Sequence, residues 1–263
     1  MISYIKSLKA ATIEKQKMGI ELDIASQIQL NSVPNVFPAF PERNDFDIHA
    51  YMRPAKEVGG DFYNFFLIDD NHLAMVMADV SGKGIPASLF MMVSNILLTE
   101  SLKLGSSPKD ALNYINKRIC AKNTLNMFVT IWVGILDLTT GDVIASNAGH
   151  DDPIIGSKGK FSLRKSKHGL VVGAMDDIEY ENYEFKINKG DKIFLYTDGI
   201  PEATNKNNML YSIDNLVETL NTFKNDSCKE LIKDVLYNVD KFVGSAPQFD
   251  DITMMAIEYK GND

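Results

Sequence analysis

The chain has 263 residues, of which 45% are hydrophobic and 24% are charged, so it can form one domain with a substantial core and an appendage. Its net charge of −8 disfavours general binding to nucleic acid or to an anionic membrane, because both surfaces are negatively charged. The two cysteines, Cys120 and Cys228, lie far apart without C-x-x-C spacing, a pattern typical of reduced, buried thiols in a cytosolic protein.

The first 30 residues predict a helix with an apolar face. Ile24 and Ile28 widen this face, and Lys15 and Gln29 interrupt it. A heptad-like seam runs through Tyr4, Leu8, Ala11, Met18, Leu22 and Ala25. Such a face must be buried, either against the chain's own domain or in a parallel or crossed homodimer through residues 1–30.

A proline-rich stretch, VPNVFPAFPERND, ends this helix at Pro34, Pro38 and Pro41. The predicted organisation is a linker or dimerisation helix over residues 1–33, a linker over 34–44 and a domain over 45–263.

Strand and helix patterns alternate irregularly through this domain. The predicted strands are 47–53, 61–68, 73–80, 127–136, 143–146, 183–187, 192–196 and 252–259. The predicted helices are 86–104, 108–121 and 227–242. Strand pairs, then two helices, then more strands and one helix indicate an α+β fold in which antiparallel sheets carry helices outside.

The chain is expected to be soluble and cytoplasmic. Its start, MISYIKSLKA, has no secretory apolar segment. The longest uncharged run, residues 85–99, is shorter than the roughly 20 residues that a bilayer span needs.

Aspartates stand at the edges of four predicted strands. Asp61 follows Gly59-Gly60, Asp79 ends an apolar strand, Asp198 follows Tyr196-Thr197, and Asp250-Asp251 precede the last strand. Each one alone is typical of a turn. Strand ends can converge at one rim, where carboxylates repel one another unless a cation neutralises them. Oxygen ligands without His or Cys favour Mg²⁺ or Mn²⁺, and two such ions can activate a water for attack on phosphorus.

Five motifs occur in an order and spacing that resemble the PPM (type 2C-like) metal-dependent protein phosphatases, and more narrowly their bacterial SpoIIE branch. They are RPAKEVGGDFYNFF, ADVSGKGIPASLFM, NAGHDDP, YTDGIPEATN and FDDITMMAIEY, and the similarity covers about residues 45–258. The resemblance implies a four-layer α/β/β/α sandwich of two antiparallel sheets, with a two-metal Mn²⁺ or Mg²⁺ site at one rim.

The resemblance also implies the metal ligands: Asp61, Asp79, the Val80 carbonyl, Asp198 and Asp250. Asp79 is the implied bridging ligand, and Asp250 aligns with the family's ligand better than Asp251 does.

This sequence departs from the eukaryotic relatives at two places. Gly60 replaces an acidic residue before Asp61, and Lys56 stands where those relatives place a phosphate-binding arginine. Lys56 could meet phosphate as a point charge, with Arg53 as a second candidate, and a solvated surface role is the alternative for both. The His of Asn147-Ala-Gly-His150 is expected to tie its loop, and Ser81 is not expected to be a nucleophile.

The leading interpretation is a phosphoserine/phosphothreonine protein phosphatase. The SpoIIE resemblance implies a phosphorylated bacterial regulator as substrate, such as a STAS-domain anti-sigma-factor antagonist, and therefore a role in sigma-factor regulation. It also implies a sensor domain before residue 1, in which case the chain is the cytoplasmic part of a longer, membrane-anchored protein. A regulatory binding module with lost or conditional activity is the alternative. A nucleotidyl cyclase is disfavoured because no G-x-x-x-x-G-K-[ST] element is present.

Overall fold

The computed structural model describes residues 2–261, and among the first ten residues it describes the side chains of Tyr4 and Lys9 only. The helices are α1 (Ile2–Leu30), α2 (Ile85–Lys103), α3 (Pro108–Cys120), α4 (Ile213–Thr222) and α5 (Cys228–Val243). The strands are β1 (Phe46–Arg53), β2 (Phe62–Asp69), β3 (His72–Val80), β4 (Val129–Asp137), β5 (Asp142–Ala148), β6 (Ile154–Ser157), β7 (Lys160–Leu163), β8 (Tyr183–Lys186), β9 (Lys192–Tyr196) and β10 (Ile252–Tyr259).

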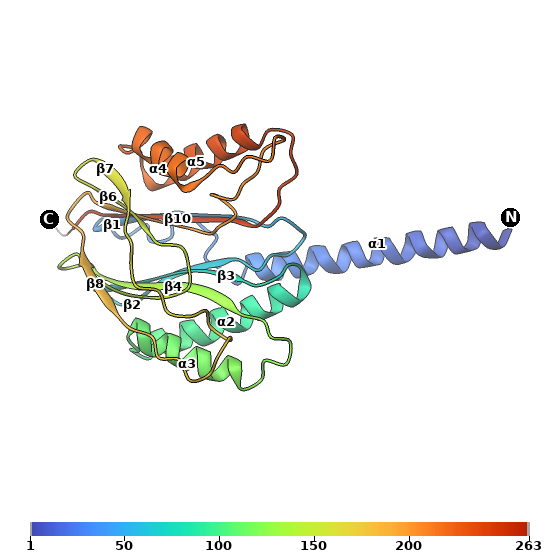
Figure 1. The fold of residues 1–263 in the computed structure, drawn as a ribbon, viewed down its shortest axis with the longest axis horizontal. Helices are drawn as coiled ribbons and strands as arrows, with labels where there is room; N and C mark the ends of the chain where they lie inside the picture. The colour runs from blue at the N-terminus through green and yellow to red at the C-terminus, as the bar shows by residue number, and fades with distance from the viewer. Residues whose placement is uncertain (1, 262–263) are drawn as a thin grey trace.

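Two five-stranded antiparallel sheets pack face to face, and helices cover both outer faces (Figure 1). One sheet has the order β1-β10-β9-β6-β7 and lies under α4 and α5. The other has the order β2-β3-β4-β5-β8 and lies over α2 and α3. The predicted α+β, four-layer sandwich is therefore confirmed.

The central strands are buried because both of their faces are covered. In β3 the run from Leu73 to Ala78 is fully buried, and Trp132 of the neighbouring β4 is among the largest buried side chains. The Trp132 ring lies so close to Gly134 that a Cβ there would stand 2.4 Å from it. Such continuous burial explains why the aspartates at the strand ends are the first polar groups that the chain presents at the rim.

One two-stranded hairpin and one helix were missed by the strand and helix patterns. One is the β6–β7 hairpin, whose turn residues Lys158 and Gly159 both have positive φ, as a tight two-residue turn requires. The other is α4, which begins where the Ser212 hydroxyl accepts a hydrogen bond from the Asn215 amide. Apolar residues at 213, 216, 217 and 220 have helical spacing and were the available signal for α4.

The predicted N-terminal helix is present as α1, which projects from the domain (Figure 1). Its described apolar side chains are largely exposed, with Met18 at 58% and Ile24 and Ile28 at 53%; the Leu8 side chain lies outside the described residues. Leu22 and Ala25 of the same face are half-buried, so the described part of this face is exposed at some positions and partly covered at others. Gln29, expected to interrupt the face, is buried: its amide donates to the Gly59 carbonyl and accepts from the Gly59 N–H.

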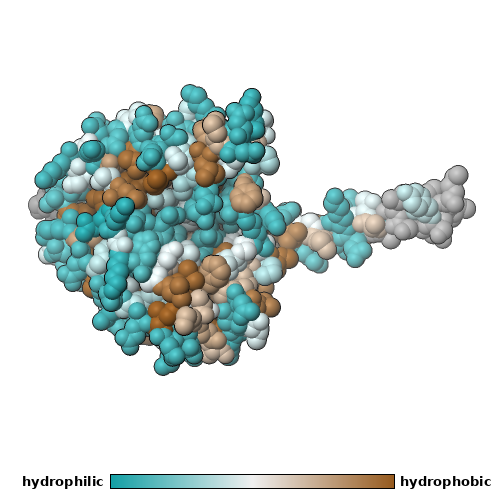
Figure 2. Space-filling model, viewed as in Figure 1, coloured by the Kyte–Doolittle hydropathy of each residue, from teal (hydrophilic) through white to brown (hydrophobic). Residues whose placement is uncertain are grey.

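Helix α2 is the one helix within residues 2–261 that is long and apolar enough to cross a membrane by length and composition. Of its apolar window, 44% is buried, and its contacts are with β2, β3 and α3. These contacts are those of a core helix. Its outward face, with Ile85, Leu89 and Val93, lines an apolar groove of about 630 Å³ beside α3, and Figure 2 shows apolar surface over this region.

Candidate active site

Asp61 and Asp79 meet at the rim because β2 and β3 are antiparallel neighbours. Asp61 immediately precedes β2, and Asp79 is the penultimate residue of β3. The register pairs Phe62 with Ala78, which places the start of one strand beside the end of the other. The two carboxyl groups interact, since each affects the pKa of the other.

The other sheet brings its own aspartates to the same rim. Asp198 follows β9, and Asp250 precedes β10, whose start lies beside the end of β9. Thr197 connects the two sheets: its N–H donates to the Thr253 carbonyl at 3.0 Å, and its hydroxyl donates to Asp61 Oδ2 at 2.7 Å.

These carboxyl groups raise one another's pKa. Burial, followed by the charges of Asp79 and Asp251, raises the pKa of Asp61 well above its usual value. Burial and then the charge of Asp198 raise the pKa of Asp79 to about 7. Burial and then the charge of Asp250 raise the pKa of Asp198 to about 6. Such mutual repulsion is what a bound divalent cation relieves.

The paired aspartates before β10 have different surroundings. Asp251 is buried, and its carboxylate accepts hydrogen bonds from the backbone amides of Ala55 and Gly60, each at 2.7 Å. Asp251 therefore anchors the loop between β1 and β2.

Asp250 instead faces the rim. Its Oδ2 lies 2.8 Å from Lys83 Nζ, its side chain is 26% exposed, and its charge acts on both Asp79 and Asp198. The charge of Asp251 also acts on Asp61 and Asp79, so the two carboxylates differ in their hydrogen-bond partners and exposure, while both lie near the rim.

Close packing explains the two glycines before Asp61. A Cβ on Gly59 would stand 2.3 Å from Asp251 Oδ2, and a Cβ on Gly60 would stand 2.8 Å from the Val80 carbonyl oxygen. An acidic side chain therefore does not fit at Gly60 in this backbone, which accounts for the departure from the eukaryotic pattern. The Val80 carbonyl, predicted as a ligand, lies directly against this glycine.

A cavity of about 340 Å³ opens beside Asp79 and Asp198. Its lining residues are Asp79, Thr130, Gly149, His150, Asp151, His168, Asp198 and Glu202. Sequence reasoning missed Asp151 and Glu202, although both lie within the motifs NAGHDDP and YTDGIPEATN. Burial, then the charge of Glu202, raises the pKa of Asp151 to about 6.

His150 and Ser81 have structural partners, as expected from the sequence. His150 is buried, with one ring nitrogen 2.8 Å from the Thr130 hydroxyl and the other 3.0 Å from the Tyr196 carbonyl. Burial lowers the pKa of His150 to about 4, so the ring is neutral. The Ser81 hydroxyl accepts a hydrogen bond from the Phe128 amide at 2.9 Å.

The two predicted phosphate-binding cations lie apart from the cavity. Lys56 is exposed on the loop between β1 and β2 and is not among the residues that line the cavity. Arg53 forms a two-pronged ion pair with Asp240 of α5, at 3.0 and 2.6 Å.

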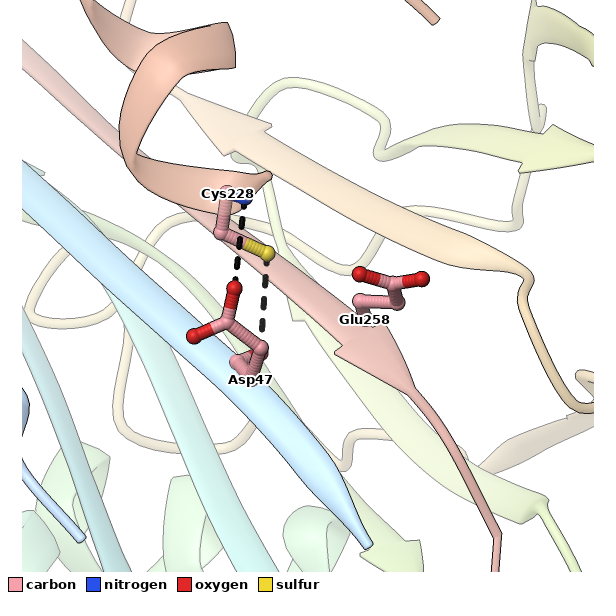
Figure 3. Close-up of side chains that lie close together, drawn as sticks. All are labelled: Asp47, Cys228 and Glu258. Atoms are coloured by element: carbon pink, nitrogen blue, oxygen red, sulfur yellow. Dashed lines mark hydrogen bonds between the residues drawn. The ribbon is translucent and has the colours of Figure 1, made fainter. Parts of the chain in front are cut away.

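A second group of acidic residues lies toward the opposite end of β10 (Figure 3). Ligand atoms of Asp47, Cys228 and Glu258 lie within 4.8 Å of one another. Cys228 is the first residue of α5, and its backbone amide donates a hydrogen bond to Asp47 Oδ2 at 3.3 Å. Lys192 Nζ lies 3.9 Å from Glu258. Burial, followed by the charges of Asp47 and Glu258, raises the pKa of the Cys228 thiol well above its usual value. The Cys228 amide and Lys192 partly balance the two carboxylates.

Comparison with known families gives one match that covers most of the chain. Residues 69–260 match the family described as Stage II sporulation protein E (SpoIIE). The chain belongs to the SpoIIE family. The matched range of the SpoIIE family includes Asp79, Asp198 and Asp250 and begins after Asp61.

Relatives by sequence include Protein IcfG from Synechocystis, 30% identical over 98% of this chain and 44% of that protein. Phosphoserine phosphatase RsbU from Bacillus subtilis is 27% identical over 94% of this chain and 72% of that protein. The chain therefore spans less than half of IcfG.

Solved structures share the fold. The SiaA-PP2C domain of Pseudomonas aeruginosa superposes with a TM-score of 0.83 at 20% identity, covering 94% of this chain and 98% of that one. The RsbU and RsbW domains of a Mycobacterium tuberculosis protein give a TM-score of 0.71 at 22% identity, covering 83% of this chain and 61% of that one. These likenesses establish the PP2C-type architecture.

Proposed function

We propose that this chain is a metal-dependent protein phosphatase that hydrolyses phosphoserine and phosphothreonine. The observation that carries the proposal is the convergence of Asp61, Asp79, Asp198 and Asp250 from four strand ends at one rim, beside an open cavity. Membership of the SpoIIE family and the names of the relatives RsbU and RsbP, both phosphoserine phosphatases, support it.

The donor set fits Mn²⁺ or Mg²⁺. The converging groups are carboxylates, which suit hard divalent cations, and each of the three most buried ones is destabilised by its neighbours' charge. A structural relative, RsbX, is described in complex with magnesium. The proposed ligands are the four rim aspartates and the Val80 carbonyl.

Two bound ions would activate a water and neutralise the phosphate during attack on phosphorus. This chain's own residues position those ligands. Asp79 interacts with both Asp61 and Asp198, which supports it as the proposed bridging ligand. The Thr197 hydroxyl orients Asp61, and Asp251 fixes the backbone of the preceding loop. Lys56 remains the proposed phosphate contact, and it would have to swing inward from its exposed position.

The deciding experiment is hydrolysis of p-nitrophenyl phosphate and of a phosphoserine protein with Mn²⁺, with Mg²⁺ and with EDTA. We expect activity only with metal. Metal-independent activity, or none on either substrate, would contradict the proposal.

For the substrate, we propose a phosphorylated STAS-type regulator in bacterial sigma-factor signalling. The support is the similarity to RsbU and to a structure that joins RsbU and RsbW domains. The test is a panel of purified phosphoproteins, in which a phosphorylated STAS domain should be turned over faster than an unrelated phosphoprotein.

We propose a homodimer through residues 1–30 as the assembly, with a sensor domain preceding them in the full protein. The exposed apolar side chains of α1 support an intermolecular contact, since leaving them in water is unfavourable.

A regulatory binding module with lost or conditional activity is the second candidate. It predicts binding of the phosphoprotein without turnover at any metal concentration, which the same assay distinguishes.

A further inference from the structure

Lys83 reaches from one sheet to the other across the rim. It lies in the loop Ser81–Gly84, between β3 and α2, where Gly82 and Gly84 both have positive φ. Its side chain crosses to the segment before β10, where Nζ is 2.8 Å from Asp250 Oδ2 and donates to the Phe249 carbonyl. The same ammonium lies 4.2 Å from the centre of the Phe249 ring.

Both carboxylate oxygens of Asp250 already have partners. Asp250 Oδ1 accepts a hydrogen bond from the Asp251 amide at 3.0 Å, and Oδ2 pairs with Lys83. A divalent ion that shared this carboxylate oxygen with the ammonium would be repelled by it, because both groups are cations in close proximity.

Lys83 interacts electrostatically with more than one rim aspartate. Its charge also acts on Asp198, the other rim aspartate of the same sheet. Lysine presents a compact charge on a flexible stem, and its side chain is 28% exposed, so it can withdraw without disrupting the core.

We propose that Lys83 is a built-in cation that competes with the metal for Asp250 and so lowers the affinity of the site for its ion. The inference rests on the proposed function, because it takes Asp250 as a metal ligand. It assigns Lys83 a regulatory part at the site: for a metal ion to bind at Asp250, the ammonium has to move away from the carboxylate.

The test is direct Mn²⁺ binding, measured as free Mn²⁺ by electron paramagnetic resonance and by calorimetry, on the full chain. Lys83→Met should bind the ion at Asp250 about three- to tenfold more tightly than the wild type, because the competing ion pair is partly exposed and modest in strength. Lys83→Arg keeps the charge and should bind Mn²⁺ within about twofold of the wild type.

Lys233→Met is the matched control. Lys233 also forms a 2.8 Å ion pair with a carboxylate, Glu230, but on the exposed face of α5. This variant should leave Mn²⁺ affinity unchanged, which separates competition at Asp250 from a general change in net charge.

Thermal melting should show each variant folded, and Lys83→Gln serves as a second neutral variant. Unchanged or weaker Mn²⁺ binding by both neutral variants would overturn the inference while leaving the proposed function intact. A wild-type chain that binds no Mn²⁺ or Mg²⁺ at millimolar concentration would overturn both.

Discussion

A group of acidic side chains lies at each end of β10, and the two groups differ in the neighbours of their carboxylates. At the rim, the neighbours of Asp61, Asp79 and Asp198 are largely other carboxylates, and their pKa values rise. At the other end, Asp47 accepts from the first amide of α5, and Glu258 has Lys192 beside it. The two ends of β10 therefore differ in how many of the neighbours of each acid are other carboxylates, and variants at the two ends can test whether that difference marks a metal site.

Asp250 and Asp251 show the same contrast within two adjacent residues. Asp251 is satisfied by two backbone amides and belongs with the structural acids. Asp250 has a movable cation, Lys83, and belongs with the rim. Variants at the two kinds of position should accordingly separate loss of activity from loss of stability.

The largest expected effect is at Asp79. Asp79→Asn should abolish phosphatase activity, by about a thousandfold or more in kcat/KM, because it removes the charge of the proposed bridging ligand. Asp61→Asn and Asp198→Asn should behave similarly. The measurement is steady-state hydrolysis with saturating Mn²⁺, alongside thermal melting.

Cys120→Ser and Cys228→Ser are the controls for Asp79→Asn, and both should retain wild-type activity. Full activity in Asp79→Asn would remove this residue from the metal site.

The next largest effect is the difference in activity between variants of the adjacent residues Asp250 and Asp251. Asp250→Asn should lower kcat/KM more than tenfold further than Asp251→Asn does, a difference of about 1.4 kcal/mol of transition-state stabilisation. Asp251→Asn should instead lower the free energy of unfolding by about 1–3 kcal/mol, since an amide cannot accept from both backbone N–H groups as the carboxylate does. Activity and denaturant unfolding of both variants would check this, and the reverse order in kcat/KM would show that Asp251 is the ligand.

The sequence predicted the parts of this molecule that depend on local pattern. Continuous apolar runs placed β3, β9 and β10, and the aspartates at their ends followed from the same runs. Contacts between distant segments could not be predicted: Lys83 bonds to a carbonyl 166 residues away, and Gly60 donates to a carboxylate 191 residues away. Gln29 was expected to weaken an apolar face, but its partner is the backbone of Gly59, which no helical periodicity shows.

A smaller effect is expected from α1. Deleting residues 1–30 should give a monomer and change the Mn²⁺ concentration for half-maximal activity by about fivefold, a typical coupling between sites. The physical link is Gln29, which bonds both backbone groups of Gly59 in the loop that precedes Asp61. Sedimentation at micromolar concentration and Mn²⁺ titrations check the two parts.

Gln29→Ala in the full chain is the matched control for this deletion. It keeps the apolar face and should keep the dimer while shifting the Mn²⁺ titration. An intact chain that sediments as a monomer, with a titration that truncation leaves unchanged, would end the proposal that α1 dimerises and tunes metal recruitment.

The smallest effect on activity is expected at the group of Asp47, Cys228 and Glu258. Glu258→Gln should leave kcat/KM and the Mn²⁺ titration within about twofold of wild type, because Glu258 lies at the far end of β10 from the rim. It should lower the free energy of unfolding by about 1–2 kcal/mol, since Lys192 is buried and loses the carboxylate 3.9 Å away. Lys186→Met, at an exposed ion pair with Asp142, should cost less than 1 kcal/mol and is the matched control. If Glu258→Gln instead weakened Mn²⁺ binding or abolished hydrolysis, the group of Asp47, Cys228 and Glu258 would be a metal site too. The partners of the carboxylates would then not distinguish the two ends of β10.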